Sequence, residues 1–266
     1  MKVYIMTDME GAGGVINRSH VFSDQPGYPQ ARHWLTMDVN AAVEGAIAGG
    51  ATEVLVLDGH GGNGACNFLY DELHPGAQYI QGAPYTQFPQ GMDDSFDGLF
   101  FVGAHAMAGT PGAILEHTMS SMSWVEMRIN GVPTGEIGLF AAAAGMYGVP
   151  FVMVSGDDKA CREAASISPE IECAVVKEGI SRHCAKLLPP AKVRDLIKEK
   201  AGLAMGKLKS VQPVKIEGPV EVHIRYFRND LVEPIREREG VRKVDPQSVI
   251  YSGRDLLDAW NKVVGG

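Results

Sequence analysis

The chain has 266 residues and a formal net charge of −8. It is long enough to bury a sizeable core without disulfides, and its apolar fraction of 45% and charged fraction of 21% exclude a wholly disordered chain. The densest basic stretch, residues 236–243, is interleaved with Glu237 and Glu239. Its positive field largely cancels, so we expect no nucleic-acid partner.

The cysteines and the N-terminal segment favour a cytoplasmic protein. The four cysteines form no CxxC pair, and so few cysteines in a long chain are typical of a reducing compartment. The apolar run at residues 2–7 is too short for a signal peptide. No stretch approaches the roughly 20 apolar residues needed to cross a bilayer, so we expect no membrane partner.

Strand-like and helix-like segments alternate along most of the chain. Short apolar runs predict strands at residues 2–7, 53–58, 98–103, 151–155 and 173–177. Helical spacing of apolar residues predicts a helix over 30–48, ended by Gly49-Gly50. An alanine-rich segment predicts a buried helix over 135–147, and Asp157 or Asp158 can cap the helix after the fourth of these strands. A longer amphipathic helix is predicted over 189–208, with proline at its start.

Two further patterns suggest antiparallel structure. Residues 124–129 predict a strand that turns at Asn130-Gly131, a strong hairpin dipeptide. Apolar residues alternate with polar ones over 220–226, which is typical of a half-exposed strand. A last helix is predicted over 252–264, with Ser252 and Asp255 at capping-box spacing.

This order of elements predicts a three-layer α/β/α fold with a mostly parallel (mixed) sheet, plus a C-terminal extension. A composition shift near residues 211–219 divides the chain into an α/β catalytic domain, 1–210, and a C-terminal α+β segment, 211–266. That segment could pack on the same domain.

Potential metal ligands follow three of the predicted strands. Asp8 and Glu10 follow the first, His60 the second and His105 the third. Ligands of open α/β sheets bind beyond the carboxyl ends of the strands, so we expect these four residues to converge. Carboxylates and imidazoles together suit zinc, manganese, cobalt or iron. A carboxylate such as Asp8 can bridge two metals about 3.5–4 Å apart.

Each piece alone has an ordinary explanation. Asp8 and Glu10 could cap a helix, and a single histidine after a strand is more often a loop residue than a ligand. The run Gly61-Gly62-Asn63-Gly64 lacks the lysine and the spacing of a P-loop, so we expect no nucleotide site. Three ligand-type residues at three strand ends make the metal site the better interpretation.

The ordered motifs of the chain resemble peptidase family M55, the D-aminopeptidases. The resemblance extends over about residues 1–208. It rests on Asp8-Met9-Glu10-Gly11, Asp58-Gly59-His60, Gly103-Ala104-His105, Thr110-Pro111-Gly112, His117-Thr118-Met119 and Gly135-Glu136-Ile137-Gly138. Thr7 stands where the family usually has serine, and the stretch between His105 and His117 is one residue longer.

The resemblance implies a centre of two zinc ions, with manganese or cobalt as alternatives. Asp8 would be the bridging ligand, and Glu10, His60, His105 and Glu136 the other ligands. His117 would be the catalytic histidine, acting as nucleophile or as general acid/base. The resemblance also implies a homo-oligomer, a decamer of two rings, and a small peptide or amino-acid amide as substrate.

The expected reaction is hydrolysis of the peptide or amide bond next to a free N-terminal amine. Preference for D-residues follows from the resemblance alone. One alternative is another two-metal hydrolase, an amidase or a phosphoesterase. A phosphoesterase should show arginine or lysine near the metals, and Arg18 is the nearest basic residue to the first motif. The other alternative is a peptide-binding protein without catalysis.

Overall fold

The computed structural model describes residues 1–61 and 66–265. Within these residues, the main sheet has seven strands. The strand order is β3-β2-β1-β4-β7-β8-β9, and every pair is parallel except β8 with β9. The glycine run that we excluded as a P-loop lies mostly outside the described residues. The bounds are β1 Lys2–Thr7, β2 Glu53–Asp58, β3 Gln78–Ile80, β4 Gly98–Ala104, β7 Phe151–Asp157, β8 Glu172–Ser181 and β9 Cys184–Leu187.

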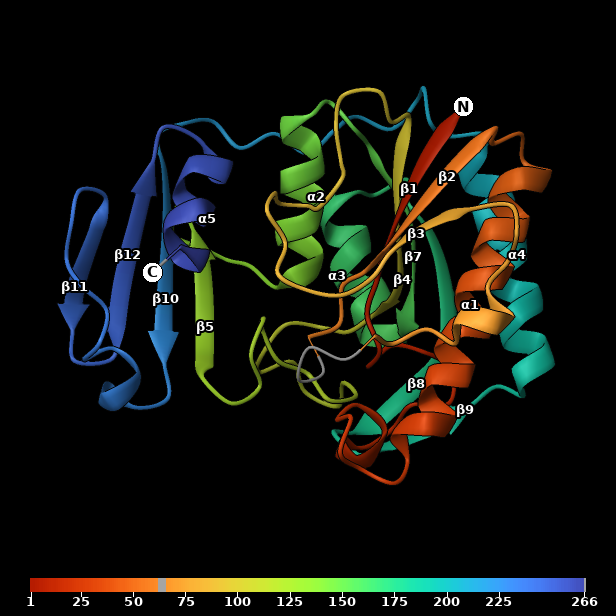
Figure 1. Cartoon of the computed structure of the whole chain (residues 1–266), viewed down its shortest axis with the longest axis horizontal. Coiled ribbons are helices and arrows are strands. Elements are labelled where there is room, and N and C mark those ends of the chain that lie inside the picture. The colour runs from red at the N-terminus through yellow and green to blue at the C-terminus, as the bar shows by residue number, and fades with distance from the viewer. Residues whose placement is uncertain (62–65, 266) are drawn as a thin grey trace.

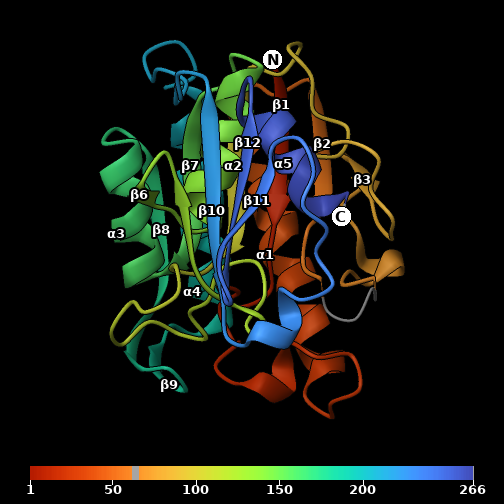
Figure 2. The same cartoon turned by 90° about the vertical axis from the view of Figure 1, so that its left-hand side faces the viewer.

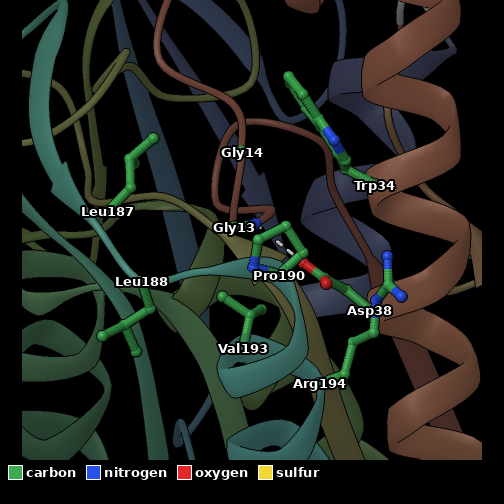
Figure 3. Close-up of a pocket in the computed structure, with 9 residues that line it drawn as sticks. All are labelled: Gly13, Gly14, Trp34, Asp38, Leu187, Leu188, Pro190, Val193 and Arg194. Atoms are coloured by element: carbon green, nitrogen blue, oxygen red, sulfur yellow. Dashed lines mark hydrogen bonds between the residues drawn. The ribbon is translucent and has the colours of Figure 1, made fainter.

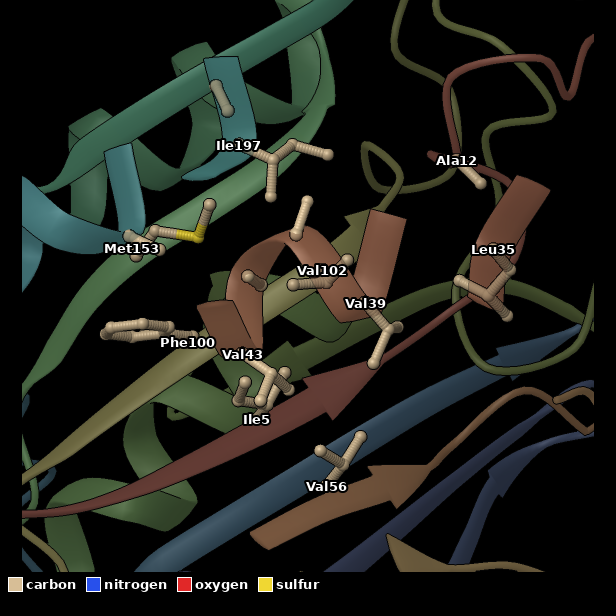
Figure 4. Close-up of a cluster of buried hydrophobic side chains, with 14 of the residues drawn as sticks. Ile5, Ala12, Leu35, Val39, Val43, Val56, Phe100, Val102, Met153 and Ile197 are labelled. Carbon is tan, nitrogen blue, oxygen red and sulfur yellow. The ribbon is translucent and has the colours of Figure 1, made fainter. Parts of the chain in front are cut away.

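Helices cover both faces of this sheet, which confirms the predicted three-layer α/β/α class (Figure 1). α1 (Tyr28–Ala48) and α4 (Pro190–Met205) pack together on one face. Their buried residues meet those of the central strands in one apolar cluster; Ile5, Val39, Phe100 and Ile197 belong to it (Figure 4). α2 (Glu136–Met146) and α3 (Asp158–Ile167) cover the other face.

A second, antiparallel sheet stands beside the α/β layers, at the left in Figure 1 and toward the viewer in Figure 2. Its order is β11-β12-β10-β5-β6, from Val241–Asp245, Ser248–Gly253, Val220–Tyr226, Trp124–Ile129 and Val132–Pro133. The hairpin predicted at Asn130-Gly131 is confirmed, since both residues have positive φ and β5 pairs with β6. Because β5 pairs with β10, this sheet takes strands from both sides of residue 210.

The last helix, α5 (Leu256–Val264), packs on the second sheet. The predicted capping box is wrong. Ser252 lies within β12, whereas Asp255 is itself the N-cap and accepts a hydrogen bond from the backbone N–H of Asp258. The strand continues further than the pattern indicated, so the helix begins four residues later.

α2 joins the two parts of the molecule. Ile137 and Phe140 belong to the core beneath the main sheet, while Leu139 and Ala142 belong to the core of the second sheet. A helix that is buried on all sides needs small apolar residues all round, which explains its alanine-rich sequence. Its first residue, Glu136, is thereby held at the seam between the two sheets.

Among the described residues, no helix combines the length and the apolar character required to cross a membrane.

Candidate metal centre

All six residues expected at the site lie together. The carboxyl ends of the neighbouring parallel strands β1, β2 and β4 meet at one edge of the sheet. Asp8 and Glu10 follow β1, His60 follows β2 and His105 follows β4; Glu136 begins α2, and His117 lies between β4 and β5. Their ligand atoms form two groups, Asp8 with Glu10 and His60, and Glu136 with His105 and His117.

Asp8 lies between the two groups and faces both. Its Oδ1 is 3.0 Å from Nδ1 of His60, and its Oδ2 is 3.1 Å from Nε2 of His105. Glu10 Oε2 lies 3.2 Å from the same His60 nitrogen. Glu136 Oε1 lies 3.1 Å from Nε2 of His105. One carboxylate shared between two imidazole–carboxylate groups is the arrangement of a bridged two-metal site.

A backbone carbonyl contacts the outer nitrogen of each imidazole. His60 Nε2 lies 2.8 Å from the carbonyl of Val21, His105 Nδ1 2.9 Å from that of Ala106, and His117 Nδ1 2.9 Å from that of Leu115. A carbonyl only accepts, so these ring nitrogens donate. The other nitrogen of each ring then faces the carboxylates. This is the orientation of metal-binding histidines, whose ligating nitrogen loses its proton when the metal binds.

The inner atoms fit a cation. Asp8 Oδ2, Glu10 Oε2 and His105 Nε2 are buried, and none of them has a hydrogen-bond partner among residues 1–61 and 66–265. Buried polar atoms nearly always have a hydrogen-bond partner, so a group of three without one needs an explanation. Lone pairs of oxygen and nitrogen converging from several sides are the donor set that binds zinc or a related divalent metal.

The buried carboxylates and imidazoles of the site hold one another in their charged forms. Burial opposes the charge of the imidazoles, but Glu10 and Asp8 raise the pKa of His60, and Glu136 and Asp8 raise that of His105, well above its ordinary value. Burial disfavours the charged form of Glu10, but the neighbouring His60 holds the pKa of this carboxyl well below its usual value. Burial likewise opposes ionisation of Glu136, and the nearby His105 lowers its pKa. The carboxylates therefore stay anionic at neutral pH, as metal ligands must be.

The loop after β1 is anchored by a buried lysine that the sequence did not reveal. Lys177 of β8 donates from Nζ to the carbonyls of Glu10 (2.6 Å), Ala12 (2.8 Å) and Val15 (2.6 Å). Burial lowers the pKa of Lys177 to about 7, while Asp157 acts to raise it. Three carbonyls satisfy all three donors of an ammonium group. The loop that carries Asp8 and Glu10 is therefore fixed to β8.

A second anchor comes from α1. Asp38 Oδ2 accepts a hydrogen bond of 2.8 Å from the backbone N–H of Gly13, and Trp34 packs against Gly14 (Figure 3). β4 approaches the same loop closely. A Cβ on Gly103, where φ is +78°, would lie 2.0 Å from the carbonyl oxygen of Asp8. Only glycine allows this approach, and the motif Gly103-Ala104-His105 thus has a structural reason.

The loop that carries His117 is also fixed. Leu115 and Met119, two residues to either side, both have positive φ, at 51° and 56°. Such backbone is costly for residues other than glycine and persists only where the surroundings enforce it. Asp157 accepts from the N–H of Ile114 (2.7 Å), and Glu136 accepts from that of Met119 (2.6 Å).

His117 itself stacks on His105, with ring centroids 4.0 Å apart. Its Nε2 lies 3.5 Å from Glu136 Oε1. The ring lines the cavity of about 290 Å³ that contains Asp8, Glu10, His60 and Glu136.

Sequence reasoning missed the basic residues close to this cavity. Arg182 and His183 lie in the turn between β8 and β9, far from every ligand motif, yet they line a cavity that adjoins the site. Arg182 also holds the loop that carries His117, since its carbonyl accepts from the N–H of Leu115 at 3.1 Å. Only the position of β8 relative to β4 in the sheet brings these residues near, and no local pattern encodes that.

Comparisons with known proteins agree with the fold and show the family. The family model of peptidase M55, D-aminopeptidase, matches residues 1–264. A curated D-aminopeptidase from Bacillus subtilis (strain 168) is 35% identical over 267 residues, covering 99% of this chain and 96% of that protein. A solved structure of a Zn-dependent D-aminopeptidase from Bacillus subtilis, a self-compartmentalizing protease, superposes with a TM-score of 0.94 at 34% identity. That match covers 100% of this chain and 96% of the other. The chain therefore belongs to the peptidase M55 family of D-aminopeptidases.

Proposed function

We propose that the chain is a zinc-dependent D-aminopeptidase that hydrolyses the N-terminal peptide or amide bond of substrates containing D-amino acids. Family membership supports the reaction and the stereochemistry. The observation on which the proposal depends most is the Asp8 carboxylate, which faces His60 with one oxygen and His105 with the other.

In this proposal Asp8 would be the ligand common to both groups of a centre that holds two zinc ions, or manganese or cobalt ions. Glu10 and His60 complete one ligand group, and His105 and Glu136 the other. When bound, the ions supply polarisation of the scissile carbonyl and a water whose pKa falls toward ~7. The carbonyls of Val21 and Ala106 keep the two imidazoles oriented for ligation.

His117 is the proposed catalytic residue. Its Nδ1–H is held by the carbonyl of Leu115, so Nε2, which lies 3.5 Å from Glu136 Oε1, is the ring nitrogen on the side of the ligand carboxylates. From this position it can take a proton and deliver it to the leaving amine, or attack the carbonyl directly. The strained backbone at Leu115 and Met119 fixes the ring against His105.

Turnover and metal content test the proposal together. The purified protein should hold close to two zinc ions per chain and release D-alanine from D-alanine amide and from D-alanyl peptides. The corresponding L-compounds are the control. If the metal-loaded protein hydrolyses a phosphate ester and no peptide or amide, it is a two-metal hydrolase of another class.

Substitution His117→Ala separates catalysis from binding. We expect the variant to retain its metal and to lose at least about 10²-fold in kcat, the usual contribution of a positioned acid/base. His74→Ala is the matched control, because His74 lines neither cavity near the site. Full activity in the His117 variant would remove this residue from the mechanism.

We also propose that the chain assembles as a homo-oligomer, a decamer of two rings. Support comes from the solved relative, which is a self-compartmentalizing protease. The protomer has a mass of 28.6 kDa, so ten copies related by closed symmetry would weigh about 286 kDa. Sedimentation equilibrium measures this mass directly, and a monomeric mass at micromolar concentration would contradict the assembly.

A further inference from the structure

A second cavity of about 170 Å³ adjoins the cavity of the metal centre. We refer to it as the basic side cavity, because Arg18, Arg182 and His183 line it. Glu10 and His117 line both cavities. They therefore lie at the junction, and a molecule bound at the metal centre can extend past His117 into the side cavity.

The two cavities differ in their charged groups, although Glu10 lines both. The metal cavity contains the carboxylates of Asp8, Glu10 and Glu136. The side cavity contains two guanidinium groups, of which Arg182 is already paired with Glu116. Within residues 1–61 and 66–265, no carboxylate lies within 4.0 Å of the Arg18 side chain, whose recorded contacts are the Phe22 ring (4.4 Å) and Met122 Sδ (3.8 Å).

Arg18 is positioned although it is exposed. It begins the short 3₁₀ helix η1 (Arg18–His20), which Asn17 caps by accepting from the N–H of Ser19. The guanidinium lies over the aromatic face of Phe22, a favourable contact for a cation. Arginine presents its donors in a planar fork that matches a carboxylate with two parallel hydrogen bonds.

We infer that Arg18 recognises the C-terminal carboxylate of the peptide substrate, with the leaving residue in the basic side cavity. This inference rests on the proposed aminopeptidase function. A peptide carries an ammonium group at one end and a carboxylate at the other. Arg18 repels the ammonium end and attracts the carboxylate end, so its charge orients the chain with its leaving residue beside Arg18.

The size of the cavity sets the reach of this recognition. Since one water takes up about 30 Å³ of liquid volume, 170 Å³ corresponds to roughly five or six waters. That is the space of one small residue. The carboxylate should therefore be recognised best when few atoms separate it from the scissile bond.

The test compares D-alanyl-D-alanine with its C-terminal amide, D-alanyl-D-alaninamide, as substrates of the zinc-loaded protein. We expect the wild type to prefer the free carboxylate. Arg18→Gln should lower the ratio of the two kcat/KM values by about tenfold or more, mainly through KM, because a charge-assisted pair is lost. Arg18→Lys keeps the charge without the fork and should retain part of the preference.

Arg254→Gln is the control, since this arginine is 88% exposed and lies next to α5. It should leave the ratio unchanged. An Arg18→Gln variant that loses activity equally on both substrates, or on neither, overturns the inference. If the wild type hydrolyses neither compound, the proposed function fails. Calorimetric binding of the same two compounds then tests Arg18 separately. If the compound with the free carboxylate binds more tightly than the amide and Arg18→Gln abolishes this difference, the subsite is supported. If the wild type binds both compounds equally, the subsite is refuted.

Discussion

The buried side chain of Asp38 makes the stability of the folded protein depend on pH. It is fully buried on α1 and accepts from the N–H of Gly13, in the loop that carries two ligands of the proposed centre. Burial raises the pKa of Asp38 from 3.8 to about 6. The folded protein therefore keeps this proton at a pH where the unfolded chain has released it. The stability that the neutral carboxyl contributes is fully present below pH 3.8 and is lost as the pH rises through 6.

Substitution Asp38→Asn should remove this dependence, because the amide oxygen still accepts from Gly13 and does not ionise near neutral pH. Between pH 5 and 7.5 we expect the difference in unfolding free energy between variant and wild type to shift by on the order of 1 kcal/mol in favour of the variant. Urea unfolding of both proteins at the two pH values measures it, and every shared titration cancels in the difference. A parallel pH dependence in the two proteins would mean that Asp38 ionises normally.

At the scale of elements, α2 illustrates what the sequence could and could not predict. Its alanine-rich composition indicated a buried helix, and its bounds are confirmed within one residue. That it is buried between two sheets follows only from the pairing of β5 with β10, strands about 90 residues apart. The strand-end rule found Asp8, Glu10, His60 and His105. It could not find Glu136, which reaches the site from a helix, and only the family resemblance indicated it.

The packing of α2 can be tested at a glycine. A Cβ on Gly145 would lie 1.7 Å from the carbonyl oxygen of Val214, in the segment that leads to β10. Gly145→Ala should therefore cost a few kcal/mol, in the range of other overpacked cores. Gly202→Ala in α4 is the matched control: its nearest contact is 3.6 Å away, and alanine favours a helix by roughly 0.5–1 kcal/mol. The midpoint of thermal unfolding should thus fall for Gly145→Ala and rise for Gly202→Ala. Equal shifts would show that a Cβ at Gly145 fits between α2 and its neighbours.

At the scale of the whole molecule, the proposed metal centre links parts of the chain that are distant in sequence. Its ligands come from the ends of β1, β2 and β4 and from the first turn of α2, so bound ions would connect the main sheet to the helix that supports the second one. Without them, the buried carboxylates of Asp8 and Glu10 depend for neutralisation on the imidazoles of His60 and His105, 3.0–3.2 Å away. A ligand at about 1,000 times its Kd stabilises a folded protein by ~4 kcal/mol.

Removal of metal should therefore lower the unfolding midpoint by on the order of 10 °C in a chain of this size. Zinc should restore it and magnesium should not, because imidazole nitrogens are poor ligands for magnesium. Hydrogen exchange adds a spatial readout. After chelation, protection should fall in residues 8–16 and 105–119 and in the first turn of α2, whereas β10 and β12 should stay protected. An unchanged midpoint in protein from which metal analysis shows complete removal, or a loss of protection spread evenly over both sheets, would contradict a metal centre that organises the carboxyl edge of the main sheet.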